Sequence, residues 1–163
     1  LEVIDAESLN QFETDLISVY GLRPTRGTNR SGKTGKPIPF VSLLSKRAYE
    51  DLHTYCDFRS STWFVPPQIF AANLPIKREF LRALFDDEGT VVRDRKQLKV
   101  RLYSINLNGL LQIQQILQEF SLGSRIKTGY GSKRNVFGLI LQDTQQFAEK
   151  VGFNLLRKQS LLR

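Results

Sequence analysis

Hydrophobic residues recur with helical spacing near the middle of the chain. Phe80, Leu81, Leu84 and Phe85 are one, three and four positions apart, which brings them to one face of a helix, and the small Ala83 lies next to that face. The pattern predicts a helix that is buried along one side. The rest of the chain is expected to be organised around it.

Three acidic residues follow this apolar face directly. The helix runs into Asp86, Asp87 and Glu88 before Gly89 is expected to end it as a C-terminal glycine. The helix dipole opposes acids in a last turn, each by roughly 0.3–1 kcal/mol. A divalent cation such as Mg²⁺ would relieve this repulsion, because carboxylates and free helix carbonyls are hard oxygen ligands. The alternative is that Asp86 bonds to the turn backbone while Asp87 and Glu88 point into water.

Further elements are predicted on both sides of this helix by alternating or amphipathic spacing. Downstream, two strands, a helix, a strand pair and a last helix follow, and upstream a hairpin lies between two helices. The predicted ranges are 89–94, 98–105, 108–120, 125–141 and a helix from residue 144 downstream, with 8–20, 23–43 and 46–55 upstream. The chain is therefore expected to belong to the α+β class.

The strand predicted over residues 98–105 has two different faces. Leu98, Val100 and Leu102 alternate with polar residues, which gives one apolar face and one basic, hydrogen-bonding face. A sheet with such a face can lie in the major groove of DNA, where Arg and Lys reach guanine and Gln reaches adenine. The alternative is an ordinary antiparallel sheet with a solvated polar face. The expected DNA-binding residues are Gln97, Lys99, Arg101, Tyr103, Arg125, Lys127, Lys133, Arg134, Arg23, Arg26, Arg30 and Lys33.

Charge supports a nucleic-acid partner. The net charge is +8, and residues 16–49 hold basic residues but no acid, while acids gather near the N-terminus and after the central apolar face. Such separation predicts a positive surface that follows a phosphate backbone around an acidic centre. One cysteine and one histidine exclude an internal disulfide and a Cys/His zinc site. With no membrane-length apolar run and no visible signal peptide, the expected location is the cytoplasm, in association with the nucleoid.

The first part of the chain is similar to the last part. Residues 1–9 lie over residues 102–110 at an offset of 101, and with small shifts the match continues through helix, hairpin and helix. The chain is interpreted as a partial first half-domain over residues 1–60, a linker over 61–76 and a complete half-domain over 77–163. Chance similarity is the alternative. Because the chain contains no methionine, Leu1 is not expected to be the start of translation.

Residues 27–34 satisfy the phosphate-loop pattern G-x-x-x-x-G-K-[ST]. A phosphate loop needs a buried strand before it and the N-terminus of a helix after it. Here Gly35, Pro37 and Pro39 follow, and residues 23–26 are polar. The stretch is therefore interpreted as the tip of a basic hairpin, whose glycines and lysines suit DNA phosphates.

Residues 81–89, Leu-Arg-Ala-Leu-Phe-Asp-Asp-Glu-Gly, resemble the nine-residue signature of the LAGLIDADG homing endonucleases, of the archaeal intron- or intein-type. The match includes the first, third, sixth, eighth and ninth positions, with Ala83 third and Glu88 eighth. The predicted order of elements is also similar to one half of the αββαββα fold of that family. The resemblance implies half-domains with a saddle-shaped antiparallel sheet that binds double-stranded DNA.

The same resemblance implies a site-specific homing endonuclease that hydrolyses phosphodiester bonds at a long DNA target with Mg²⁺ or Mn²⁺. Glu88 would be the catalytic acid and a metal ligand, and Asp87 a further metal ligand. Asp86 and Gly89 would hold the helix end. Glutamate in place of the family's aspartate keeps the charge but lengthens the side chain by one methylene, which affects the spacing to the metal.

Polar residues around the attacking water are also implied by the resemblance. They would be Asn106, its counterpart Asp5 in the first half, and Lys158, with Arg157 as the neighbouring alternative to the lysine. These residues are therefore candidates for a catalytic role.

Cutting two strands needs two acids, whereas this sequence holds one motif. The second motif helix would pack against Phe80, Ala83 and Leu84. It would come either from a second copy in a homodimer or from a segment upstream of Leu1 in a pseudo-symmetric monomer. The internal repeat favours the monomer.

Two other functions fit the same fold. A DNA-binding regulator without cleavage and an RNA-splicing maturase would both use the basic surface and tolerate loss of the metal site. Glu88 argues against the regulator, because a neutral residue at this position would have favoured it.

Overall fold

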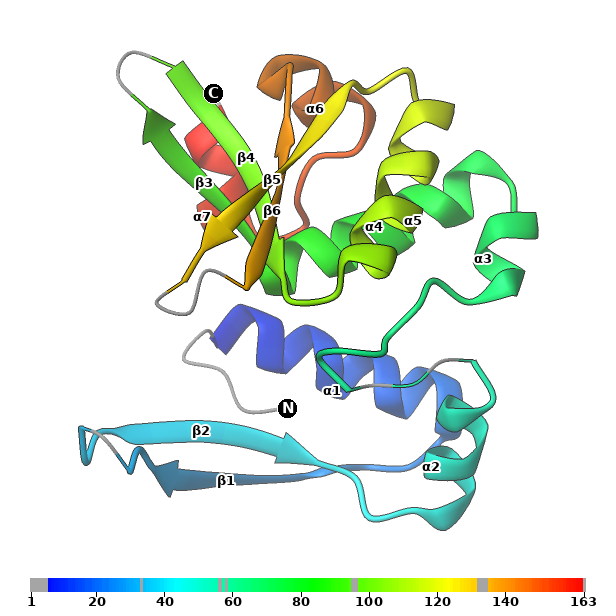
Figure 1. Ribbon diagram of the computed structural model, residues 1–163. Coiled ribbons are helices and arrows are strands. Elements are labelled where there is room, and N and C mark those ends of the chain that lie inside the picture. The colour runs from blue at the N-terminus through cyan, green and yellow to red at the C-terminus, as the bar shows by residue number, and fades with distance from the viewer. Residues whose placement is uncertain are drawn as a thin grey trace. The chain divides into compact units, whose positions relative to one another are not determined.

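The computed structural model describes residues 6–32, 34–55, 57, 59–94, 97–131 and 135–162. The chain divides into two compact units, unit 1 from Leu1 to Leu52 and unit 2 from His53 to Arg163 (Figure 1). None of the helices in these described ranges combines the length and the apolar character needed to cross a membrane.

Unit 1 is a β-hairpin between two helices, in the order that the sequence predicts. It consists of α1 (Ala6–Tyr20), β1 (Thr25–Arg30), β2 (Pro37–Ser42) and α2 (Lys46–His53). Leu9 and Leu16 are seven positions apart, so they share a helix face, and both are buried with Val41 of β2. In the described part of the chain, β2 pairs with β1 alone.

The phosphate-loop pattern falls within this hairpin. β1 and β2 pair antiparallel, with Thr25 opposite Ser42 and Arg30 opposite Pro37. A nucleotide loop would need a helix where β2 begins. The predicted hairpin is therefore confirmed, but residues 27–30 of the pattern lie within β1 and not at the tip.

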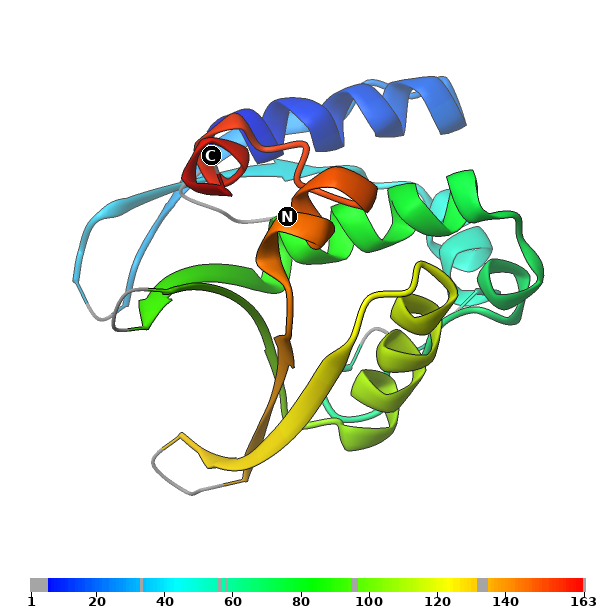
Figure 2. The ribbon, with the colours of Figure 1, turned by 90° about the horizontal axis from the view of Figure 1, so that it is seen from above.

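Unit 2 is a four-stranded antiparallel sheet with strand order β3-β4-β6-β5. Its helices α4, α5 and α6 share one core with the strands, and Figure 2 shows α4 and α5 beside the curved sheet. The elements are α3 (Pro67–Ala71), α4 (Leu74–Glu88), β3 (Gly89–Asp94), β4 (Gln97–Ser104), α5 (Leu107–Glu119), β5 (Ser124–Tyr130), β6 (Val136–Leu141), α6 (Thr144–Lys150), α7 (Leu156–Gln159) and the short 3-10 helix η1 (Ser160–Leu162). The predicted α+β class with antiparallel sheets is confirmed.

The core of unit 2 forms around α4, as the apolar spacing predicts. Leu81 and Phe85 are completely buried, and the ring of Phe85 lies 4.9 Å from that of Phe147 in α6. Val100 and Leu102 of β4 complete this core from the sheet. Asn73 caps the start of α4, because its side-chain oxygen accepts a hydrogen bond from the backbone N–H of Ile76.

The segment interpreted as a linker, residues 61–76, is part of unit 2. Val65 is buried and belongs to the core, and a Cβ on Gly109 would lie within 2.5 Å of the ring of Trp63. The boundary between the two compact units lies at residues 52 and 53. The division into half-domains stays an interpretation of the repeat.

Candidate functional site

The last turn of α4 is held by a segment that follows α6. The carboxylate of Asp86 accepts hydrogen bonds from the backbone N–H groups of Asn154 and Leu155, at 3.1 and 3.2 Å. Partial burial raises the pKa of Asp86, while these two hydrogen bonds and the charge of Lys158 act in the opposite direction. Asp86 thus bonds to a distant backbone rather than to its own turn.

Lys158 makes the return contact from α7 to α4. Its buried ammonium group donates hydrogen bonds to the carbonyl oxygens of Phe85, Asp86 and Gly89, at 3.0, 2.6 and 2.6 Å. A cation at this place neutralises the negative end of the helix dipole. These three carbonyl oxygens at the helix end thus already accept a hydrogen bond from Lys158.

Gly89 ends α4 in a different way from the one predicted. Its φ and ψ are −77° and 145°, which is an extended conformation and not the left-handed one of a C-terminal glycine. A Cβ at this position would lie 2.4 Å from the carbonyl oxygen of Phe85. Glycine is required by this close approach, and it lets α4 run directly into β3.

Glu88 and Asp87 both lie at the exposed end of α4, next to a cavity of about 660 Å³. Partial burial and then the charge of Asp87 raise the pKa of Glu88, and Lys158 opposes them. In the described ranges, no three His, Cys, Asp or Glu side chains converge on a metal-sized site. The two carboxylates are hard oxygen donors suited to Mg²⁺, but further ligands must come from water, from DNA or from another acid.

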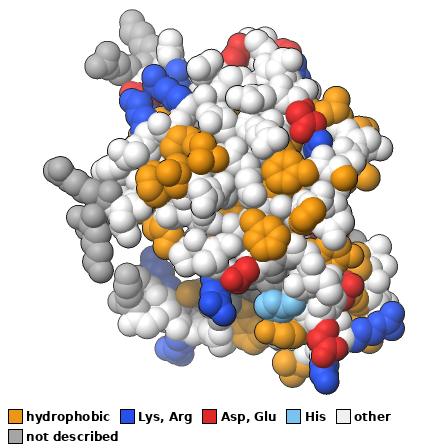
Figure 3. Space-filling model, turned by 45° about the vertical axis from the view of Figure 1, so that its right-hand side comes forward, with side chains coloured by type: hydrophobic (Ala, Val, Ile, Leu, Met, Phe, Trp, Pro, Cys, Tyr) orange, Lys and Arg blue, Asp and Glu red, His pale blue; other side chains and the backbone are white. Residues whose placement is uncertain are grey.

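The same cavity is bordered by the apolar side of α4. Phe80 and Leu84 are partly buried and line it, and Ala83 is exposed beside them. Figure 3 shows that hydrophobic side chains reach the surface of the molecule among acidic and polar ones. The apolar surface predicted for helix pairing therefore leads directly to Glu88. The remaining lining residues are Asp57, Ser60, Trp63, Phe64, Pro66, Leu102, Tyr103, Ser104, Ile105 and Val136.

Asn106 has structural contacts that the resemblance did not indicate. Its side-chain oxygen accepts a hydrogen bond from the backbone N–H of Gly109 at 3.1 Å, which caps α5. Its side-chain nitrogen donates to the carbonyl oxygen of Trp63, and the residue is only 7% exposed. Because both ends of the amide are engaged, this geometry does not support the expected direct contact with an attacking water.

Six of the expected DNA-binding residues lie on one face of the sheet in unit 2. In the ladder, Arg101 is opposite Thr90 and Ile140, and Tyr103 is opposite Gly138, while Val100 and Leu102 turn to the core. Paired residues in an antiparallel ladder share a face. The pairings of β5 with β6 add two more members, so the six are Gln97, Lys99, Arg101, Tyr103, Arg125 and Lys127. We call this set the basic face.

Other expected residues are not part of the basic face. Arg26 pairs with Val41, so it lies on the side of the hairpin that faces α1, where it bonds to Glu13 and Asn10. The guanidinium of Arg26 is thus engaged by α1 in the free protein, and binding of DNA by Arg26 stays a prediction. Arg23 and Arg30 are exposed in unit 1. Lys33, Lys133, Arg134 and Asp5 lie outside the described residues.

Sequence reasoning missed Tyr130, which lies next to Tyr103 on the same side of the sheet as the basic face. Its ring makes an edge contact with that of Tyr103 at 5.1 Å between centroids. Strict alternation from Arg125 and Lys127 would have put residue 129 on this face, but the register of β5 shifts after Lys127. Gly129, with φ of +88°, was the available signal for this bulge.

Comparison with known proteins agrees with this geometry. Residues 75–154 match the family described as LAGLIDADG-like domain. The A subunit of DNA gyrase from Mycobacterium leprae (strain TN) is 26% identical over 137 residues, which cover 82% of this chain and 10% of that protein. The chain thus spans about a tenth of the length of this curated relative.

Solved structures extend the likeness to nearly the whole chain. A structure of mesophilic variants of the homing endonuclease I-DmoI matches with a TM-score of 0.65 at 15% identity, covering 99% of this chain and 80% of the other. I-DmoI in complex with DNA and Mn matches with a TM-score of 0.61 at 15% identity, covering 94% and 76%. At such identity the likeness concerns the fold, which is the α+β arrangement of helices and antiparallel sheets described above.

Proposed function

Because this chain belongs to the LAGLIDADG homing endonuclease family, we propose that it is a site-specific endonuclease that hydrolyses double-stranded DNA at a long target site with Mg²⁺ or Mn²⁺. The observation that carries the proposal is the position of Glu88. Its carboxylate stands at the end of α4, where the chain enters the sheet that carries the basic face. An acid beside a cationic surface is what cleavage of a bound phosphate backbone requires.

Glu88 and Asp87 would hold the metal ion. They are adjacent carboxylates whose mutual repulsion contributes to the raised pKa of Glu88, and a bound cation would remove this repulsion. When bound, the ion supplies an activated water and stabilises charge on the phosphate oxygens. The protein's own part is to present the two carboxylates at a fixed helix end.

Lys158 would act as a positioning residue in this mechanism. Its three hydrogen bonds fix the backbone on both sides of Glu88, at Phe85, Asp86 and Gly89. Asn106 would contribute by capping α5 and not by contact with water. Asp5 keeps the role that the resemblance implies, as the counterpart of Asn106 in the first half, near the attacking water.

The basic face would bind the DNA. Arg101 of β4 and Arg125 of β5 both lie opposite Ile140 of β6, and Lys99 lies two positions before Arg101 on β4. The sheet is curved and its other side is filled by the core (Figure 2). Lysine and arginine neutralise phosphates and release counterions, whereas glutamine and arginine can also read base edges. Affinity would therefore come from the whole face, and sequence discrimination from those members that reach bases.

A second acid is needed for the second strand, and unit 1 indicates where its helix would pack. Unit 1 has the order helix, strand, strand, helix, as do α5, β5, β6 and α6. Both last helices begin with a side-chain cap, because Ser45 accepts from the N–H of Ala48 and Asp143 from that of Gln146. Aligning the two caps brings Tyr49 to the place of Phe147.

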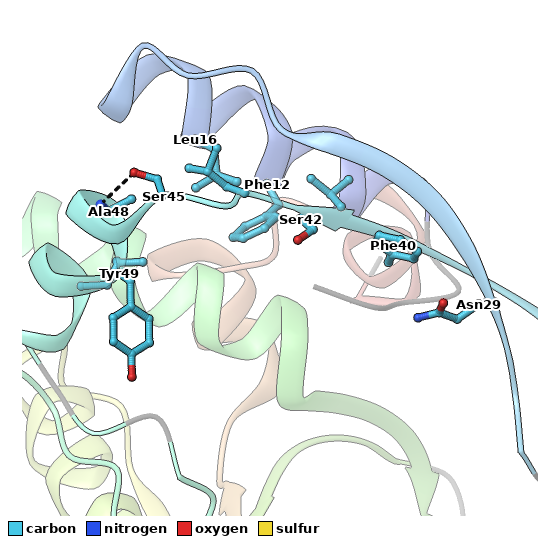
Figure 4. Close-up of a pocket in the computed structure, with 11 residues that line it drawn as sticks. Phe12, Leu16, Asn29, Phe40, Ser42, Ser45, Ala48 and Tyr49 are labelled. Carbon is cyan, nitrogen blue, oxygen red and sulfur yellow. Dashed lines mark hydrogen bonds between the residues drawn. The ribbon is translucent and has the colours of Figure 1, made fainter.

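These equivalent aromatic residues have different surroundings. Phe147 is completely buried and its ring contacts Phe85 of the motif helix α4. Tyr49 is 65% exposed and lines a cavity of about 480 Å³, into which Phe12, Phe40 and Tyr49 project from α1, β2 and α2 (Figure 4). We infer that unit 1 is a partial half-domain and that a second motif helix, related to α4, belongs in this cavity.

This arrangement would make the protein a pseudo-symmetric monomer. The two motif helices would pair through the surface of Phe80, Ala83 and Leu84, beside Glu88. A homodimer that pairs two copies of α4 is the other arrangement, and the stoichiometry of the DNA complex distinguishes the two. One protein chain per duplex supports the monomer.

The test is cleavage of a randomised DNA library by the complete product of the gene that encodes this chain. Reactions with Mg²⁺ and with a chelator are compared for wild type, Glu88→Gln and Glu79→Gln. Glu79 is a matched control, because it is an exposed acid of the same helix that pairs with Arg78 and Arg82. We expect metal-dependent cleavage by wild type and Glu79→Gln, and none by Glu88→Gln. DNA binding without cleavage, unchanged in Glu88→Gln, would contradict the proposal and leave a DNA-binding regulator or an RNA-splicing protein.

A further inference from the structure

Arg101 occupies the central strand β4 of the basic face, and its side chain is held in place. Its Nη2 lies 2.9 Å from Oδ2 of Asp94, and its Nη1 lies 3.4 Å from the hydroxyl of Tyr103. Only 19% of its side chain is exposed. Its Nε is enclosed and has no hydrogen-bond partner among the described residues, so the guanidinium is engaged through its terminal nitrogens alone.

Two tyrosine rings pack together next to Arg101. The rings of Tyr103 and Tyr130 meet edge to face at 72° above Gly138. A Cβ on Gly138 would come within 2.8 Å of the ring of Tyr130 and 3.0 Å of the ring of Tyr103. Because glycine leaves room for this pair, the hydroxyl of Tyr103 has a fixed position, and Arg101 is fixed between it and Asp94.

Asp94 differs in charge from the rest of the surface. It pairs with Gln97 and is the one acid among the described strand residues on the side of the sheet that carries the basic face, and its side chain is 52% exposed. A carboxylate accepts hydrogen bonds from a guanidinium with the same charge and geometry as a phosphate. Asp94 therefore occupies Arg101 in the free protein in the way that a DNA phosphate would occupy it in a complex.

We propose that Asp94 is a specificity-determining residue, which keeps Arg101 from binding the backbone phosphates of non-target DNA. This inference rests on the proposed DNA-binding function. A duplex that merely lies against the basic face must displace Asp94 before it gains Arg101. A duplex that fits the whole basic face gains enough other contacts to offset the cost of displacing Asp94 from Arg101. Discrimination between target and non-target DNA then comes from the cost of displacing Asp94 as well as from favourable contacts with the target.

The experiment measures binding of a fluorescently labelled duplex of random sequence to the full chain over a series of salt concentrations. The proteins are wild type, Asp94→Asn, Arg101→Gln, the double variant and Glu79→Gln. Glu79 is the matched control, an acid that also pairs with arginine but lies on α4. We expect Asp94→Asn to bind roughly threefold to tenfold more tightly than wild type at low salt, with a salt slope steeper by about 0.9 because one more phosphate is neutralised.

The double variant tests whether the gain acts through Arg101. In the Arg101→Gln background, Asp94→Asn should give no more than the small change seen in Glu79→Gln. A gain that persists without Arg101, or an Asp94→Asn variant that binds like Glu79→Gln, would overturn this inference and leave the proposed function standing. Wild-type protein that does not bind the duplex in a salt-dependent way would overturn both. Circular dichroism on each variant establishes that all five proteins are folded.

Discussion

The ammonium group of Lys158 lies 2.6 Å from the carbonyl oxygen of Asp86, whose carboxylate accepts backbone hydrogen bonds from the segment that leads to Lys158. Each residue thus fixes the element that carries the other. Three acids end α4, where the helix dipole is already negative, and this pair supplies both a positive charge and two N–H donors at that point. The site can therefore keep Asp87 and Glu88 at the surface without losing its shape.

Replacing Lys158 by methionine should destabilise unit 2. The variant keeps a long side chain but leaves the carbonyl oxygens of Phe85 and Gly89 without their buried donor, at a cost of roughly 2–4 kcal/mol in the free energy of unfolding. Urea unfolding of the variant and wild type measures this difference. Arg157→Met is the control, because Arg157 is exposed in the same helix and its replacement should change the free energy by less than about 0.5 kcal/mol. Equal effects of the two variants would contradict the positioning role.

Replacing Gly89 by alanine should also destabilise the protein, for a steric reason. The new Cβ would meet backbone atoms of Phe85 at 2.4 and 2.9 Å, so α4 and β3 would have to separate. We expect a loss of about 1–3 kcal/mol by thermal or urea unfolding. Gly32→Ala is the matched control, since among the described residues no atom outside its chain neighbours lies within 4 Å of the position that its Cβ would take, and its φ is not positive. A Gly89→Ala variant as stable as Gly32→Ala would refute the close approach.

Replacing Asn106 separates a capping role from a catalytic one. Asn106→Ala removes the acceptor for the N–H of Gly109 and should lower the free energy of unfolding by about 1–2 kcal/mol. Asn106→Ser keeps a side-chain oxygen at the cap, so it should lower the free energy of unfolding by less than half of that amount. In the cleavage assay, Asn106→Ser should stay active. An inactive Asn106→Ser variant with nearly wild-type stability would instead assign Asn106 to the reaction.

The raised pKa of Glu88 predicts a pH-dependent stability difference. Burial and Asp87 raise this pKa above the ordinary value of 4.5, so the folded protein binds a proton at Glu88 more readily than the unfolded chain does. The stabilising contribution of the protonated form is complete below pH 4.5 and is lost as the pH rises through the raised pKa. At neutral pH, Glu88→Gln should therefore be more stable than wild type, by less than about 1 kcal/mol because the side chain is exposed.

Urea unfolding of Glu88→Gln and wild type at neutral pH and below pH 4.5 checks this sign. The two proteins should agree in acid, where Glu88 is protonated and resembles glutamine. Asp143→Asn should show the opposite sign at neutral pH, because backbone hydrogen bonding lowers the pKa of Asp143. A Glu88→Gln variant that is less stable than wild type at neutral pH would contradict the prediction.

Most helices and strands of unit 2, though not α3 and α7, were predictable from the spacing of their apolar residues. The strand predicted over 98–105 is β4 (Gln97–Ser104), and the helix predicted over 108–120 is α5 (Leu107–Glu119). Alternation also predicted which residues of β4 turn away from the core. The sequence pattern also predicted Glu88 as a site residue, because three acids follow an uninterrupted apolar face at the end of α4.

The contacts that fix the site were not predictable from period alone. α7 (Leu156–Gln159) is four residues long, and its buried residue is the lysine at position 158, so no apolar pattern marks it. The orientation of Arg26 depends on the register of a hairpin, and that of Tyr130 on a bulge. A shift of one residue reverses the face to which a strand side chain points. Roles that depend on register or on distant backbone atoms therefore required the structure.

The three hydrogen bonds of Lys158 join residues that are 69 to 73 positions apart. A ribosome makes α4 and all four strands of unit 2 before it reaches this lysine, and folding during synthesis begins with the earlier residues. The nascent chain can therefore bury Leu81 and Phe85 while the backbone around Glu88 is still unanchored. The backbone around Glu88 is anchored only after the last turns of unit 2, which contain Lys158, have been translated.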